Sequence, residues 1–151
     1  PIYAYETDGM GHYNLMDDAN VPSLLSIPYL QYQAAEDPVC AHTRRFLLSR
    51  DNPWFFEGSC AKGIGSPHTS EDYIWHIGLI MQALTSTDEE EIRELLKMIA
   101  GTDADTGYMH ESFHKNDPGQ FTRPWFAWAN SLFAELIYRI MKDGKQYLFH
   151  W

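Results

Sequence analysis

Irregular polar stretches alternate with apolar, helix-like stretches about five times along the 151 residues. Helices are predicted to start near Asn20, at Asp37-Pro38, near 71, near 88 and near 122–124. The stretch 71–85 is apolar on nearly all sides, which is typical of a buried helix. The stretch 88–100 has an apolar face and a charged face, which predicts an outer helix. An inner helix followed by an outer one predicts helical hairpins in an array or toroid.

The predicted helix ends depend on capping residues and prolines. Asp18 or Asn20 before Pro22 indicates the first start, and Pro28 is expected to kink or end that helix. Thr87 and Glu90 have the spacing of a capping box for the fourth helix. Strand signals are weak and are confined to 3–5 and 147–149. The expected fold is therefore all-α, as a single domain over residues 1–151.

Composition and charge exclude several classes of function. The formal net charge of −10 disfavours binding to nucleic acid or to an anionic membrane surface. No apolar run approaches the roughly 20 residues that cross a bilayer. Cys40 and Cys60 lack metal-ligand spacing; we expect buried thiols, with one disulfide as the alternative. Because the chain begins with Pro1, we expect a fragment or a processed product.

Polar clusters precede the apolar stretches, so hairpin packing would bring their loops to one end of the fold. The resulting cleft would be acidic and lined by aromatic rings. The clusters are Glu6 and Asp8 with Asp17, Asp18 and Asn20; then Ser66, His68 and Thr69; then His110, Glu111 and His114; and finally Arg123 and Trp125.

Such a cleft suits a sugar, and Glu111 is its candidate catalytic group. Glycoside hydrolysis commonly uses two carboxyl groups, one of which activates water in an inverting enzyme. Glu111 could be that base, or a solvated charge in a polar loop. The alternatives for its neighbours are also open. Asp18 or Asn20 could cap a helix, and His68 could bind a substrate hydroxyl group or act as a cap. Arg123 could donate to a sugar hydroxyl group or form a salt bridge, and Trp125 could lie in the core or stack on a sugar.

The histidines raise a metal alternative. His110 and His114 are four residues apart, with Glu111 between them. The zinc-protease motif His-Glu-x-x-His needs one residue fewer between the glutamate and the second histidine, and it lies on a helix. We therefore predict no metal and no other cofactor.

Five motifs, taken together, resemble glycoside hydrolase family 125, whose members include exo-acting α-1,6-mannosidases. The motifs occupy 16–25, 63–69, 73–75, 109–113 and 121–131. The resemblance implies part of an (α/α)6 barrel, inverting hydrolysis without a metal, and Glu111 as the general base. It implies that the pocket for mannose is surrounded by Asp17, Asp18, Asn20, His68, Thr69, His110, Arg123 and Trp125.

The resemblance covers only the C-terminal part of the family's catalytic domain. The aspartate that serves as general acid lies in an upstream motif that is absent from these 151 residues. We therefore expect the remaining N-terminal part of the barrel as a partner, and an α-mannoside glycan as the substrate. By itself the chain is expected to be inactive, and the alternative function is a non-catalytic, mannose-binding fragment.

Overall fold

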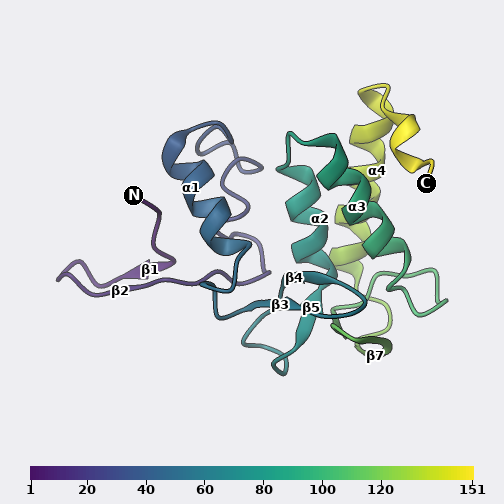
Figure 1. Ribbon diagram of the computed structural model, residues 1–151, viewed down its shortest axis with the longest axis horizontal. Helices are drawn as coiled ribbons and strands as arrows, with labels where there is room; N and C mark the ends of the chain where they lie inside the picture. Colours follow the sequence, from purple (N-terminus) through teal and green to yellow (C-terminus); the bar gives the residue numbers. More distant parts are fainter.

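The computed structural model describes residues 1–151, and a three-helix layer forms its centre (Figure 1). Helix α2 (His76–Leu84) packs against both α3 (Glu89–Ala100) and α4 (Ala127–Lys142). Helix α1 (Pro38–Leu47) stands apart from this layer, and a 3-10 helix, η1 (Gln146–Phe149), follows α4. The predicted hairpin of a buried helix and an outer helix is confirmed as α2 and α3.

The predicted all-α class is wrong, because the chain also forms seven strands in three antiparallel sheets. The sheets are β1 (Glu6–Thr7) with β2 (Tyr13–Asn14), β3 (Phe55–Glu57) with β4 (Lys62–Ile64), and β5 (Tyr73–Trp75) with β6 (Ser112–His114) and β7 (Asp117–Thr122). The expected toroid of helical hairpins is likewise replaced by a mixed α/β arrangement. Six of the seven strands have two or three residues, too few to show an alternating pattern, and β7 contains Pro118 and Gly119, which indicate a turn.

The first predicted helix is absent, and residues 20–34 form turns and bends. The Asp17 carboxylate accepts hydrogen bonds from the backbone N–H groups of Leu24 and Leu25, both at 2.9 Å. A side chain that binds backbone donors competes with helical hydrogen bonds. Pro28 supplies no N–H and disfavours a helical residue before it.

Two predicted helix starts are close to the observed ones. Asp37 caps α1 by accepting from Val39 and Cys40, with Pro38 in the first turn. The cap of α3 is Asp88, which accepts from the Glu90 N–H, so the predicted Thr87 cap is wrong by one residue. Three glutamates lie in the first turn of α3, where the positive end of the helix dipole stabilises their negative charges.

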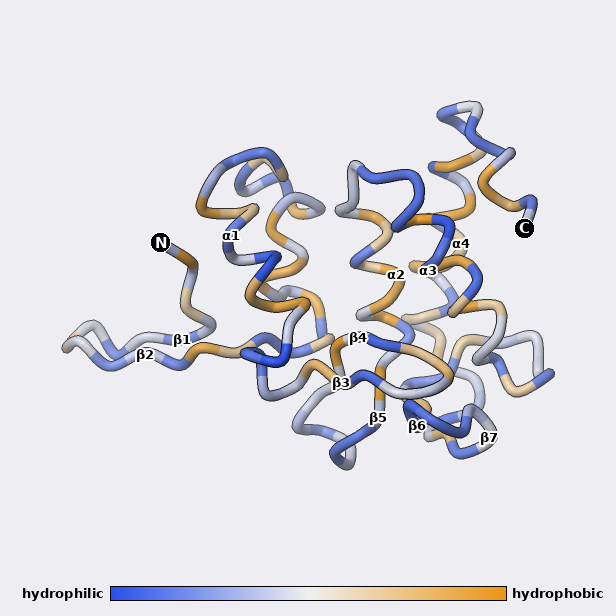
Figure 2. The backbone as a smooth tube through the Cα atoms, in the orientation of Figure 1, coloured by the Kyte–Doolittle hydropathy of each residue, from blue (hydrophilic) through white to orange (hydrophobic).

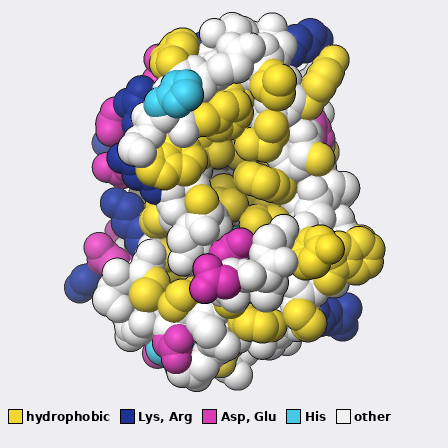
Figure 3. All heavy atoms as spheres, turned by 90° about the vertical axis from the view of Figure 1, so that its right-hand side faces the viewer, with side chains coloured by type: hydrophobic (Ala, Val, Ile, Leu, Met, Phe, Trp, Pro, Cys, Tyr) yellow, Lys and Arg dark blue, Asp and Glu magenta, His cyan; other side chains and the backbone are white.

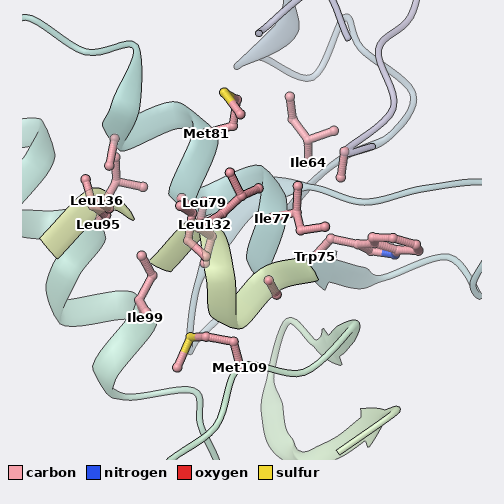
Figure 4. Packing of buried hydrophobic residues seen from close by; sticks show 14 of the residues in the cluster. Ile64, Trp75, Ile77, Leu79, Met81, Leu95, Ile99, Met109, Leu132 and Leu136 are labelled. Atoms are coloured by element: carbon pink, nitrogen blue, oxygen red, sulfur yellow. The ribbon is translucent and has the colours of Figure 1, made fainter. Parts of the chain in front are cut away.

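A cluster of 23 buried residues forms the core, which lies mainly between α2 and its two partner helices (Figure 4). Nearly all of α2 is buried, and Figure 2 shows its hydrophobic character against the hydrophilic turns. Ile77, Leu79 and Ile99 are completely shielded from solvent. Burial of each such side chain stabilises the fold by roughly 1.5–3 kcal/mol, so α2 is held by packing despite its short length.

The outer surfaces of α3 and α4 differ. Figure 3 views the molecule from the side of these helices: charged side chains are concentrated on the left flank, and hydrophobic ones are exposed over much of the rest, with a few charged groups among them. Trp128, Tyr138 and Met141 of α4 are among the exposed apolar residues. No helix is long and apolar enough to cross a bilayer.

The ends of the chain depart from the sequence expectations, whereas the cysteines are thiols as expected, although Cys60 is only half-buried. Residues 3–5 are not the predicted strand, which occurs slightly later as β1 in a projecting hairpin (Figure 1). Residues 147–149 belong to η1 and not to a strand. Cys40 and Cys60 are both free, and only Cys40 is fully buried.

We predict that Gly65→Ala destabilises the protein. An added Cβ would lie 2.2 Å from the Tyr73 carbonyl oxygen and 2.7 Å from the Phe56 ring. The backbone of β5 cannot move away cheaply, so we expect a loss of about 1–3 kcal/mol in the free energy of unfolding, measured by urea denaturation.

Gly119→Ala is the control for this substitution. Its added Cβ would meet only the exposed Asp117 carboxylate, at 3.1 Å, so we expect a change within about 0.5 kcal/mol. Equal effects of the two substitutions would contradict the steric explanation.

Candidate active site

Strand pairing places Glu111 next to Arg123. Strand β6 lies between β5 and β7, and Ser112 pairs with Thr122. Glu111 directly precedes β6 and Arg123 directly follows β7, so the antiparallel register sets them side by side. The Glu111 N–H points to the carbonyl oxygens of Thr122 and Arg123, at 3.3 and 3.4 Å. The two residues therefore meet at one edge of a three-stranded sheet.

The Glu111 carboxylate lines an open cleft of about 550 Å³. Its side chain is 13% exposed, and its Oε1 atom lies 3.2 Å from Nε of Arg123. No hydrogen bond within the chain occupies Oε2. The lining residues are Pro67, His68, Thr69, Ser70, Tyr73, Glu111 and Thr122, and Glu111 is the one carboxylate among them.

The loop 66–70 forms the opposite wall and carries two of the predicted site residues. The Thr69 hydroxyl oxygen accepts a hydrogen bond from the Trp75 indole N–H, at 2.9 Å. His68 is exposed, and its ring centre lies 6.4 Å from that of Trp75. The predicted meeting of the 66–69 and 110–111 segments is therefore observed. Trp75, which belongs to the 73–75 motif and lies in the stretch predicted as a helix, supports the wall.

Arg123 adopts a backbone conformation that is uncommon for a residue with a side chain. Its φ is +42°, in the left-handed region, and its guanidinium group lies 5.8 Å from the centre of the Phe126 ring. Such strain persists where the surroundings hold the residue in place, and it is concentrated at functional sites. Trp125 is 60% exposed beside this turn and does not line the cleft.

The acidic residues Asp17 and Asp18 of the first loop do not line the cleft. Asp17 is completely buried and binds the backbone of Leu24 and Leu25, so it does not reach the cleft. Burial raises the pKa of Asp17 to about 6, against the lowering effect of those N–H groups. Asp18 is also buried and accepts from the Asn20 amide, whose nitrogen lies 3.5 Å from the Ser66 hydroxyl.

His110 is buried and does not line the cleft. Its Nδ1 lies 2.7 Å from the carbonyl oxygen of Pro124, and its Nε2 lies 3.1 Å from that of Asp103. Its ring stacks on Phe121, with centres 4.0 Å apart. Both ring nitrogens face carbonyl oxygens of the protein, which leaves no open position for His110 as a metal ligand. No three side chains of the metal-ligating types come together anywhere in residues 1–151.

His76, the first residue of α2, is a part of the site region that the sequence did not indicate. It is completely buried, and its Nδ1 accepts a hydrogen bond from the His110 N–H, at 2.9 Å. Burial lowers the pKa of His76 to about 3. A single histidine at the start of an apolar stretch carries no pattern that distinguishes it from an ordinary core residue.

The family model for metal-independent alpha-mannosidases, glycoside hydrolase family 125, matches residues 1–138. The chain belongs to this family. The resemblance of its motifs is thus confirmed over most of the sequence.

Two similar proteins show how much of a longer chain these 151 residues represent. It is 50% identical over 142 residues to the Meiotically up-regulated gene 157 protein of Schizosaccharomyces pombe, covering 93% of this chain and 28% of that protein. A solved structure from Streptococcus pneumoniae matches with a TM-score of 0.91 and 49% identity, over 93% of this chain and 33% of that one. It is described as a metal-independent alpha mannosidase in a non-productive complex with alpha-1,6-mannobiose. The chain therefore spans about a third of the length of these relatives or less.

We predict that His76 makes this family 125 chain less stable as the pH falls from 7 to 5. The unfolded state takes up a proton near the ordinary pKa of 6.5, whereas folded His76 does so only near 3. The unfolded state is thereby favoured by about 2 kcal/mol at pH 5 relative to pH 7. Urea denaturation at both pH values should therefore show a change in stability from pH 7 to pH 5 that is about 2 kcal/mol more unfavourable in the parent chain than in His76→Asn.

The comparison with His76→Asn removes the opposing contribution of Asp17. The raised pKa of Asp17 means that the folded state takes up a proton as the pH falls below about 6, which stabilises the fold. Both proteins share this effect, so the difference between them reports His76. An equal pH dependence in the two would contradict the assignment of a neutral, buried His76.

Proposed function

We propose that the chain forms part of the catalytic domain of an inverting exo-α-1,6-mannosidase acting on mannose-rich glycans. Glu111 is the general base, which takes a proton from the water that attacks the anomeric carbon. The observation that carries the proposal is the Glu111 carboxylate in the cleft: Arg123 holds one oxygen, and the other is free for water.

The geometry around Glu111 suits a base more than a structural carboxylate. A general base must reach its proton within roughly 2.6–3.2 Å while its own position is constrained. The position of Glu111 is constrained by its salt bridge to Arg123 and by its backbone N–H, which points to the carbonyl oxygens of Thr122 and Arg123 just before β6 begins. With Oε1 paired, Oε2 is the oxygen assigned to the water.

The general acid is proposed to come from outside residues 1–151. In inverting glycosidases the two carboxyl groups are roughly 6.5–9.5 Å apart. Asp17 is committed to backbone N–H groups and Asp18 to Asn20, and neither lines the cleft. The chain covers 33% of the solved relative, so much of a longer relative's chain is available to supply the acid.

The remaining lining groups suit a sugar. Thr69, His68 and Tyr73 present hydrogen-bonding groups, and the exposed Trp125 nearby offers a flat face for a pyranose ring. The preference for an α-1,6 linkage is supported by the mannobiose in the complex of the Streptococcus pneumoniae relative. Asp18 and Asn20 are assigned to the support of the 66–69 wall.

We predict that Glu111→Gln, in a protein with the complete catalytic domain, lowers kcat for an α-1,6-mannoside by roughly 10²–10⁴-fold. The amide keeps the shape of the side chain but cannot accept the proton. Affinity for α-1,6-mannobiose, measured by calorimetry, should change little. Glu94→Gln, an exposed change on α3, is the control. Near-normal turnover by Glu111→Gln would refute the proposed base.

We further predict that the purified 151-residue chain does not hydrolyse α-1,6-mannobiose. The cleft contains one carboxylate, and hydrolysis with inversion requires two. The measurement is mannose release over days, with an intact-mass check of the protein. Release at an enzymatic rate would show that both carboxyl groups lie within the chain. Binding without release would favour the alternative of a mannose-binding fragment for the chain alone.

A further inference from the structure

We propose that His76 and Asn130 are positioning residues for Glu111, acting through the backbone of the two residues before it. The inference rests on the proposed role of Glu111 as the general base. Neither side chain lines the cleft, and both come from helices that pack in the core. We call His76, Asn130 and the backbone of 109–110 the backbone clamp.

The clamp supplies hydrogen bonds to backbone groups that no neighbouring strand reaches. Strand β6 begins at Ser112, so residues 109 and 110 lie outside the sheet. The Met109 N–H donates to the Asn130 amide oxygen at 3.1 Å, and the Met109 carbonyl accepts from the Asn130 amide nitrogen at 2.9 Å. The His110 N–H donates to Nδ1 of His76 at 2.9 Å. The side chains of Asn130 and His76 therefore bind the backbone of residues 109 and 110, as a neighbouring strand would in a sheet.

The hydrogen-bond partners of His76 determine its tautomer. The Thr102 hydroxyl donates to the Met98 carbonyl at 2.7 Å, so its oxygen is left to accept from Nε2–H of His76, 3.1 Å away. Nδ1 of His76 is therefore unprotonated and accepts from the His110 N–H. The imidazole joins the backbone before Glu111 to Thr102, which directly follows the C-cap of α3.

The clamp is rigid because its hydrogen-bonding groups are occupied and all of them except the half-buried Asn130 are buried. Met109, His110, His76 and Thr102 are each at most 5% exposed. The His76 ring also packs on Phe113, with centres 4.7 Å apart. No buried side-chain nitrogen or oxygen in the chain lacks a partner. Breaking one of these bonds leaves an unpaired buried group, which displaces the backbone that carries Glu111.

Such a displacement affects turnover more than sugar binding. A shift of about 1 Å in a reacting group can lower a rate by about 10²-fold. The opposite wall, with His68 and Thr69, does not depend on the clamp, since its bonds run to Ser66 and Trp75. Loss of the clamp is therefore expected in kcat, with KM nearly unchanged.

Two isosteric substitutions separate positioning from general packing. In His76→Asn the amide oxygen replaces Nδ1 and keeps the acceptor for the His110 N–H. In His76→Gln the amide group takes the place of Nε2, so no acceptor remains for the His110 N–H. Both remove the imidazole, so a merely structural role predicts similar effects. Exposed His42→Gln on α1 is the control for histidine replacement.

Hydrogen exchange of the His110 amide in the 151-residue chain is the first test, because it does not depend on catalysis. We expect exchange at least about tenfold faster in His76→Gln than in His76→Asn, relative to the Ile99 amide of α3. If neither variant folds, the exchange of the Met109 amide is compared in the same way between Asn130→Asp, which keeps the acceptor for the Met109 N–H, and Asn130→Leu, which loses it. Equal exchange rates in the two His76 variants would overturn the clamp.

Turnover in a protein with the complete catalytic domain is the second test. We expect kcat to fall about 10–100-fold in His76→Gln and distinctly less in His76→Asn, with KM within about twofold. Equal kcat values in the two variants would overturn the positioning role, even if Glu111→Gln is inactive. If Glu111→Gln is active, the proposed function fails, and the clamp loses its catalytic meaning whatever the exchange rates show.

Discussion

The antiparallel pairing of β6 with both β5 and β7 is the constraint on which the site depends. Its register places Ser112 opposite Thr122 and thereby sets Glu111 beside Arg123. The same strand pairs Trp75 with Ser112, and Trp75 holds Thr69 in the opposite wall. A slip of one residue would turn every side chain of β6 to the other face, so this short sheet determines what the cleft contains.

The sheet is held in place by the apolar helices above it. Strand β5 runs directly into α2, whose residues are almost all buried against α3 and α4. Phe113, in the middle of β6, is completely buried in the same cluster. Arg44 of α1 binds Glu91 of α3 at 2.9 Å, which ties α1 to the helices above the sheet. The hydrophobic core thus fixes the sheet, and the sheet fixes Glu111.

Much of the candidate site was predictable because its residues lie in recognisable motifs. Glu111, His68 and Thr69 were expected to converge, and they line one cleft. His110 was expected at the pocket, but both of its ring nitrogens face carbonyl oxygens within the protein. His76 and Asn130 escaped prediction because their roles depend on backbone groups far away in sequence. A residue that binds another segment's backbone leaves no local pattern.

The amino-acid sequence by itself determined the buried helix, the amphipathic helix after it, the cap at Asp37, and the family through motifs spread along the chain. These features rest on local spacing and on side-chain type, which a linear sequence records. Tertiary structure alone decided the three sheets, the turns at 20–34 and the partners of each polar side chain. Those outcomes depend on which distant segments meet, because short strands and buried polar groups are stable only when another segment completes their hydrogen bonds.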